Sequence, residues 1–175
     1  MISNELQRAI DHLKIRDVYL SDLTATFVDD FNPKYYAEID DLTLEFLHIV
    51  KRSVLFDASD DLQLVQISIR LGTRWADRGD PKHDESSEGD SGNDKEDTDI
   101  KAIIEAEYIA EYELNEQLDR KCIDEYALKN ASFHVWPYWR ELLASQCARM
   151  NLPKVVLPTV QFASNRDGAA ESVEE

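Results

Sequence analysis

The feature that most constrains the fold of this sequence is a run of alternating residues between positions 100 and 114. Every second residue from Ile100 to Leu114 is apolar, and four of the seven residues between them are Glu. A repeat of two residues is that of a β-strand, whose side chains point alternately to its two faces. One apolar and one acidic face predict a strand of an antiparallel sheet that is covered on one side.

Three further segments are rich in β-forming residues. Residues 15–27 alternate apolar and polar side chains before Asn32-Pro33 interrupts the chain, and residues 65–75 show a cleaner alternation. Residues 36–56 are also β-rich, but residues 46–50 suit a short helix as well, so both interpretations stay open there. Together with residues 100–114, these segments predict four long strands.

The connections and helices follow from local signals. Asp57–Asp61 predicts a turn, because short polar side chains bond their own backbone. Helical spacing predicts helices over residues 3–14 and 116–130, and a third from Pro137, which suits a first helical position, to Met150. The first helix is either frayed or docked on the rest of the chain. Four strands followed by helices predict an α+β fold, a four-stranded antiparallel sheet with helices packed on one face.

An acidic segment interrupts the pattern at residues 77–99. Ten of its 23 residues are Asp or Glu, three are Lys or Arg, and none is aliphatic or aromatic. Such a segment buries too little apolar surface to offset its ordering entropy, so a disordered loop is expected. A calcium-binding loop is the alternative, but the segment lacks the residue spacing of such a loop. We therefore expect one domain over residues 1–163, with a helical extension at 1–14 and a polar disordered tail at 164–175.

The charge balance excludes several classes of partner. The chain has 36 acidic and 19 basic residues, a formal net charge of −17, which argues against binding nucleic acid or an anionic membrane surface. An acidic chain attracts basic partners instead. No apolar run approaches the ~20 residues of a membrane span, and two cysteines, Cys122 and Cys147, suit a reducing compartment. A cytoplasmic protein without membrane insertion is expected.

Catalytic motifs are not found in the sequence. It has no phosphate-binding glycine loop, no nucleophile elbow and no metal-ligand spacing, so neither a cofactor nor a metal is expected. Of the four histidines, only His134 lies beside an aromatic cluster and is a candidate base, and a structural role is more common for such a residue. The sequence therefore predicts a binding protein rather than an enzyme.

One segment carries a family resemblance. Residues 133–141, Phe-His-Val-Trp-Pro-Tyr-Trp-Arg-Glu, resemble the Phe-Pro-Tyr-Ala-Arg-Glu motif of the SecB family of export chaperones. The matching residues are Pro137, Tyr138, Arg140 and Glu141, with Trp136 where the family has Phe. The spacing continues through Pro153 to Phe162, and residues 15–23 resemble the first strand of the family. The resemblance covers roughly residues 13–163.

The resemblance implies a bacterial, ATP-independent chaperone that holds unfolded or preprotein chains in apolar grooves. SecB-like subunits assemble as a homotetramer, a dimer of dimers, and hand clients to the SecA translocation motor. The residues that match the client groove are Leu42, Leu44 and Phe46, and those that match motor contacts are Asp22 and Glu105. The residues placed at the tetramer interface are Ile104, Ala106 and Tyr108, for which ordinary sheet core is the alternative.

Three differences from the family pattern favour a second function within the same family. Thr26 stands where the family has an acidic motor contact, and the chain after Phe162 lacks the pattern of the family's final helix. The N-terminal helix and the acidic loop are additions. Such an extension resembles the SecB-like chaperones of toxin–antitoxin systems, which protect an aggregation-prone antitoxin. Export-type holding is the leading expectation and a dedicated antitoxin chaperone the alternative. A protein that binds one folded partner through its acidic face is a third.

The acidic loop gives a first prediction. Deletion of residues 80–97 is expected to change the melting temperature by less than about 2 °C, because the segment has no apolar side chain to pack. Differential scanning calorimetry of the deleted and full-length proteins measures this. A drop of about 10 °C would show that the loop contributes to the folded state.

Overall fold

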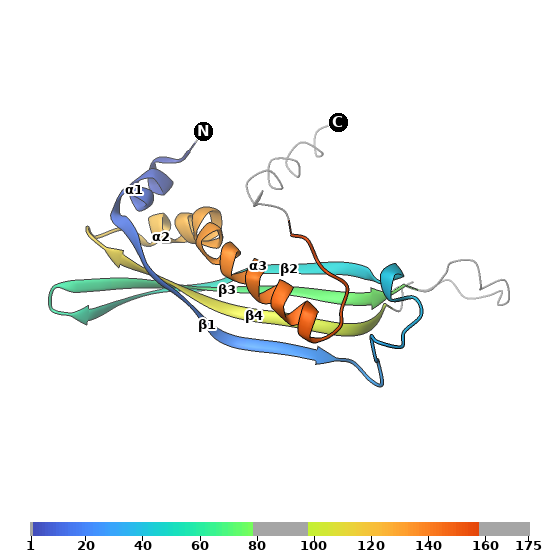
Figure 1. The fold of residues 1–175 in the computed structure, drawn as a ribbon. Coiled ribbons are helices and arrows are strands. Elements are labelled where there is room, and N and C mark those ends of the chain that lie inside the picture. The colour runs from blue at the N-terminus through green and yellow to red at the C-terminus, as the bar shows by residue number, and fades with distance from the viewer. Residues whose placement is uncertain (1, 79–97, 158–175) are drawn as a thin grey trace, which may run out of the picture.

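The structure, a computed structural model, describes residues 2–78 and 98–157. Four long strands form one antiparallel sheet in the order β1-β4-β3-β2 (Figure 1). The strands are β1 (Leu13–Phe27), β2 (Thr43–Ser59), β3 (Leu62–Asp77) and β4 (Asp99–Leu114). The predicted α+β architecture is confirmed, including the strand at the alternating segment.

The helices lie on one face of this sheet (Figure 1). They are α1 (Asn4–His12), α2 (Arg120–Tyr126) and α3 (Ser132–Arg149), with a 3-10 turn η1 (Ile39–Asp41) and a π-helical segment η2 (Ala127–Ala131). We call the covered side of the sheet the inner face and the opposite side the outer face. α3 packs mainly on β4 and also contacts β1 and β3.

Alternation along the two central strands builds the core. Ile67, Ile69 and Leu71 of β3 pair with small or apolar residues of β4, and all three are buried. Trp139 and Leu143 of α3 pack onto this layer and are also buried. The inner faces of β3 and β4 are therefore dry, because α3 covers them.

The third helix begins earlier than predicted. A start at Pro137 is wrong, because α3 begins at Ser132 and contains Pro137. Residues 127–131 are already helical in η2, so the chain enters α3 without a break. Pro137 has no backbone N–H, so it does not donate the usual helical hydrogen bond to the residue four positions earlier.

Two other boundaries differ from the prediction. The predicted turn at residues 57–61 is shorter, because β2 continues to Ser59 and Asp57 pairs with Gln63 across the hairpin. The predicted helix over residues 116–130 begins only at Arg120. The ambiguous residues 46–50 form a strand, since pairing with β3 outweighs their local helical spacing.

The N-terminal helix is docked rather than frayed. Ser3 caps α1 by accepting a hydrogen bond from the backbone N–H of Leu6 at 3.2 Å. Leu6 and Ala9 are buried against the rest of the chain, and Lys121 of α2 pairs with Glu5 at 2.6 Å. The segments predicted to be disordered, 77–99 and 164–175, lie outside the described part of the chain, except for residues 77, 78, 98 and 99.

A core substitution tests this packing. Leu143→Ala is expected to lower the free energy of unfolding by about 3 kcal/mol, because Leu143 is fully buried between α3 and the sheet. Leu128→Ala, at a side chain that is 46% exposed, is the matched control and should cost less than about 1 kcal/mol. Urea unfolding measures both values, and equal losses in the two variants would contradict this account of the core.

Candidate functional site

Two of the predicted client-groove residues are part of the core edge. Leu42 and Leu44 are half-buried and pack against the core, whereas Phe46 is 59% exposed. Phe46 pairs with Thr73 of β3, whose side chain lies on the inner face. Only Phe46 of the three therefore offers a large apolar surface to a bound chain.

Exposed apolar side chains also continue along both edge strands. Their exposed fractions lie between 37% and 59%, although they are large residues that usually lie inside. They are Ile15, Tyr19, Leu20, Leu23 and Phe27 on β1, and Phe46, Ile49, Val54 and Leu55 on β2. The sheet is thus dry in its centre and apolar but exposed along both edges.

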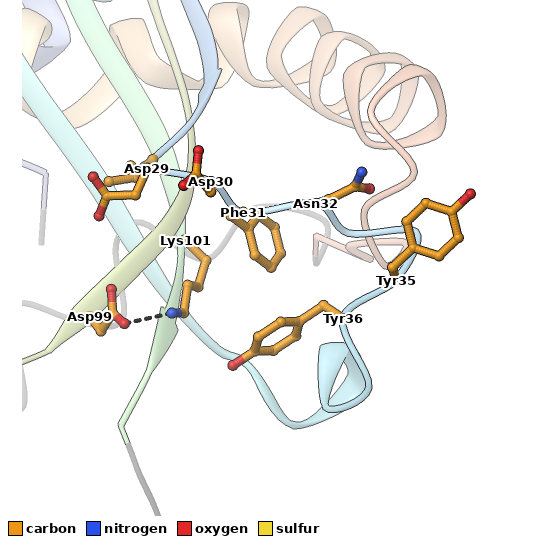
Figure 2. Close-up of a pocket in the computed structure, with 9 residues that line it drawn as sticks. Asp29, Asp30, Phe31, Asn32, Tyr35, Tyr36, Asp99 and Lys101 are labelled. Atoms are coloured by element: carbon orange, nitrogen blue, oxygen red, sulfur yellow. Dashed lines mark hydrogen bonds and ion pairs between the residues drawn. The ribbon is translucent and has the colours of Figure 1, made fainter.

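A pocket that the sequence did not predict lies in the loop between β1 and β2. It has a volume of about 440 Å³ and is lined by aromatic and charged side chains (Figure 2). The residues shown are Asp29, Asp30, Phe31, Asn32, Tyr35, Tyr36, Asp99 and Lys101, together with Val28. We call it the crossover pocket. The aromatic and acidic residues that flank Asn32-Pro33 were the available signal in the sequence.

Hydrogen bonds and ring contacts hold the crossover pocket together. Tyr36 donates a hydrogen bond from its Oη to Asp77 at the end of β3, and Phe31 packs edge-on against its ring. Lys101 lies 5.6 Å above the same ring and pairs with Asp99, as Figure 2 shows. The loop is therefore fixed to the ends of β3 and β4.

These contacts shift two pKa values in the crossover pocket. The hydrogen bond to Asp77, with burial second, raises the pKa of Tyr36 to about 12. The hydrogen bond to Asp99 raises the pKa of Lys101. Both groups thus keep their protons at neutral pH, so Tyr36 remains a donor and Lys101 a cation.

The two residues predicted to contact a motor protein lie on the outer face. Asp22 is exposed and lies 3.9 Å from Arg70, and Glu105 pairs with Arg74 at 2.8 Å. Glu107 of β4, which pairs with Asp22 across the sheet, accepts a hydrogen bond from Lys51 at 2.6 Å. Glu105 and Glu107, two of the four glutamates of the acidic face predicted for β4, are therefore paired with cations of other strands.

A glycine makes room for one of these pairs. A Cβ added to Gly72 would lie 2.8 Å from the Cγ of Glu105 and 3.3 Å from the Cβ of Leu47. The absence of a side chain thus lets Glu105 lie across β3 toward Arg74. Gly72 lies inside β3 rather than in a turn, and a glycine within a strand marks the close approach of a neighbouring group.

The three residues placed at the tetramer interface are buried in the sheet of the single chain. Ile104, Ala106 and Tyr108 are between 0% and 3% exposed in the single chain. Burial, followed by the nearby charge of Glu141, raises the pKa of Tyr108 to about 12. Their side chains belong to the core cluster that lies beneath the helices. The alternative of ordinary sheet core therefore accounts for them.

The family-motif residues line a second cavity of about 410 Å³. Pro137, Arg140 and Glu141 of α3 form one wall, and residues 154–157 form the other. Tyr138 does not line this cavity and is 49% exposed. The motif thus joins α3 to the segment that follows it.

The candidate base is partly buried beside the core. His134 accepts from or donates to the Oη of Tyr112 through Nδ1 at 2.9 Å, and burial lowers its pKa. Neither residue lines any of the cavities described in this section. Within residues 2–78 and 98–157, no group of His, Cys, Asp and Glu side chains is arranged to hold a metal ion. In the same residues, no helix is long and apolar enough to cross a membrane.

The four-stranded antiparallel sheet with helices on one face is the fold of a SecB-like chaperone of known structure. The chain is similar to the solved structure of the Mycobacterium tuberculosis Rv1957 SecB-like chaperone, which is in complex with a ChAD peptide from the Rv1956 HigA1 antitoxin. The two share 16% sequence identity with a TM-score of 0.59, over 90% of this chain and 94% of that one. No family model and no curated protein sequence matches the chain. The SecB-like fold implied by the sequence resemblance is thereby confirmed.

The Tyr36 hydrogen bond gives a testable pH dependence. Because the folded state raises the pKa of Tyr36 from 10 to about 12, its contribution to stability is complete below pH 10 and is lost as pH rises through 12. Tyr36→Phe should therefore lower stability by about 1 kcal/mol at neutral pH and weaken the loss of stability above pH 10. Urea unfolding at pH 7 to 11 measures this, with Tyr35→Phe, at a 76% exposed ring, as control. Identical pH profiles for Tyr36→Phe and the unmodified protein would contradict the assignment.

Proposed function

We propose that the protein is an ATP-independent chaperone that holds unfolded polypeptide chains. The observation that carries this proposal is the exposure of large apolar side chains along both edge strands of a SecB-like sheet. Soluble proteins rarely leave contiguous apolar surface exposed unless it binds something. Hydrophobic contact has no preferred direction, so such a surface accepts many sequences.

The expected free energies of binding suit a chaperone that holds and releases its client reversibly. Burial of one large apolar side chain contributes about 1.5–3 kcal/mol, and a dissociation constant of 1 μM corresponds to about 8 kcal/mol. Contacts of a client with several residues such as Phe46, Ile49 and Leu23 are therefore enough for a dissociation constant near the micromolar range, after the loss of entropy on binding is offset. No nucleotide is needed for capture or release.

Charge supplies selectivity among clients. The net charge of −17 attracts basic chains and repels acidic ones. The same charge makes loaded chaperones repel one another, so they stay soluble. The crossover pocket adds Asp29, Asp30 and Asp99 beside its aromatic rings. A basic and aromatic client segment fits these side chains, with Lys101 already paired to Asp99.

We propose that the subunits assemble as a dimer of dimers in the bacterial cytoplasm. Because Ile104, Ala106 and Tyr108 are buried in the single chain, the contact between dimers needs other residues. The exposed side of α3 offers Tyr138 together with Arg140 and Glu141 of the second cavity. A two-fold contact there brings the arginine of each subunit to the glutamate of the other.

A dedicated antitoxin chaperone is the second candidate. The Mycobacterium tuberculosis protein of similar fold is seen with an antitoxin peptide. The pairing of Asp22 and Glu105 with arginines of the same chain also weakens any attraction for a basic motor surface. Thr26 removes a further negative charge there. These observations support the antitoxin alternative over delivery to SecA.

A paired experiment tests both candidates. Light scattering gives the mass of the purified assembly, and the same sample is mixed with a reduced, unfolded client whose aggregation is followed by turbidity. Suppression of aggregation by a tetramer is expected, and addition of SecA or of an antitoxin segment shows which one it binds. A compact monomer that leaves aggregation unchanged would overturn the proposal.

Charge reversal on the outer face separates motor binding from client holding. Asp22→Lys and Glu105→Lys are expected to weaken any binding of SecA about tenfold and to leave suppression of client aggregation unchanged. Calorimetric titration with SecA and the turbidity assay provide the two measurements. If client holding is lost while the circular dichroism spectrum is unchanged, the assignment of this face is wrong.

A further inference from the structure

The N-terminal helix α1 lies beside α2 at one end of the sheet and is joined to it by charged side chains (Figure 1). Lys121 of α2 pairs with Glu5 at 2.6 Å, and Arg8 lies 3.8 Å from both Glu116 and Asp119. These five side chains are between 34% and 83% exposed. Ion pairs as exposed as these each contribute little to stability and are screened by salt.

The apolar part of the contact is small. α1 buries Leu6 and Ala9, whereas Ile2 and Ile10 are 61% and 39% exposed. The helix has nine residues, and isolated helices shorter than about 12–15 residues are only marginally stable in water. α1 is therefore helical only while it lies on α2, and its release is expected to cost less free energy than unfolding of the sheet.

The junction between α1 and β1 allows such a release. Leu13 is both the C-cap of α1 and the first residue of β1. From Leu13 onward, β1 pairs with β4, beginning with Leu114. Rotation of the backbone before Leu13 thus moves α1 away from α2 and leaves the pairing of β1 in place.

The helix covers an apolar side of α2. Cys122 and Glu125 are three residues apart, so they share one side of α2. Glu125 accepts a hydrogen bond from the hydroxyl of Ser3, the N-cap of α1, at 3.3 Å. Cys122 is 1% exposed and belongs to the same core cluster as Leu6 and Ala9. The cover over Cys122 on this side is therefore α1.

We propose that α1 is a releasable cover: exposed ion pairs hold it on α2, and its release bares the side of α2 around Cys122 as a further surface for basic client segments. This inference rests on the proposed function and adds a means of regulating it. The bared surface adjoins the start of β1, where Ile15 is 46% exposed. An unfolded client held at β1 then extends its contacts onto α2.

The charges that α1 leaves behind favour a basic client. Among the described residues, Glu116 pairs only with Arg8 and His12, and Asp119 only with Arg8. Both cations belong to α1, so its release leaves two carboxylates beside the bared apolar surface. A client segment with a basic residue next to apolar ones takes the place of Arg8, whereas an acidic segment is repelled.

Thiol labelling measures the release of α1. The rate at which Cys122 reacts is followed by mass spectrometry of the digested protein, with the buried Cys147 of α3 as internal reference. An increase in salt from about 0.1 to about 1 M shortens the Debye length from about 10 to about 3 Å. It is expected to speed labelling of Cys122 about fivefold and to leave Cys147 unchanged. Equal changes at both cysteines would overturn the proposal.

A charge swap tests the ion pair that holds α1. Glu5→Lys and Lys121→Glu each bring like charges together and are expected to speed labelling of Cys122 about fivefold. The double variant restores the pair and should label within about twofold of the unmodified protein. Arg78→Glu, after the opposite end of β3, is the control and should leave the rate unchanged. A double variant that labels as fast as the single variants would overturn the assignment.

Client binding is measured with two labelled peptides by fluorescence anisotropy. Both have nine residues, the length of α1, and contain Leu and Ala with either Lys or Glu. The apparent affinity of a site rises with the fraction of molecules in which it is open, so Glu5→Lys should bind the Lys peptide about fivefold more tightly than the unmodified protein does.

The two carboxylates provide the control for this gain. Addition of Glu116→Gln and Asp119→Asn to the Glu5→Lys variant should remove the gain, and the Glu peptide should show none. An equal gain for both peptides, or none for the Lys peptide, would overturn the assignment of the bared surface to basic clients.

Three further outcomes distinguish the possible failures. If the Glu5→Lys variant has a larger mass by light scattering than the unmodified protein, α1 has exchanged between copies of the chain and the client surface is overturned. If the unmodified protein suppresses aggregation of the reduced client but Glu5→Lys leaves Cys122 labelling unchanged, the cover is refuted while the chaperone proposal stands. Failure of both proteins to suppress aggregation overturns both proposals.

Discussion

The packing of α3 on the apolar inner faces of β3 and β4 is the interaction on which the rest of the structure depends. Ile67, Ile69 and Leu71 form a dry layer with the small residues of β4, and Trp139 and Leu143 cover it. Each of these side chains contributes about 1.5–3 kcal/mol when buried, so the layer supplies a large share of the stability of a marginally stable domain. One helix covers only part of a four-stranded sheet, and the edge strands remain exposed.

The exposure of the edges connects stability to function. A wider helical layer would bury Phe46 and Leu23 and remove the surface proposed to hold clients. The central strands provide stability, and the edges keep apolar side chains accessible. The two edges also differ in regularity, because the pairing of β1 has two irregularities whereas the first half of β2 has none.

The outer face shows how pairing changes the meaning of a charge pattern. The four glutamates of β4 predict an acidic surface when the sequence is considered alone. In the folded chain Glu105 lies against Arg74 across Gly72, and Glu107 lies against Lys51 and Arg70. The cations come from strands distant in sequence, so no local pattern reveals the neutralisation.

Several errors of prediction share one physical cause. Pro137 is a good first helical residue, but η2 delivers a chain that is already helical, so the helix begins at Ser132. Residues 46–50 have helical spacing, but their partner in β3 makes them a strand. Tertiary context overrides local preference in both places. The crossover pocket was missed because its aromatic residues are irregularly spaced and gather only when Tyr36 bonds Asp77.

Sequence patterns alone predicted the four strands, the apolar side of each central strand, the α+β class and the resemblance carried by Pro137, Tyr138, Arg140 and Glu141. Period-two alternation and short motifs are local properties, so they can be read without coordinates. Three properties could be seen only in the folded chain: the burial of Ile104, Ala106 and Tyr108, the ion pairs of Asp22 and Glu105, and the position of β2 at the edge of the described sheet. These properties depend on strand order and on which face the helices cover, and contacts between residues far apart in the sequence set both.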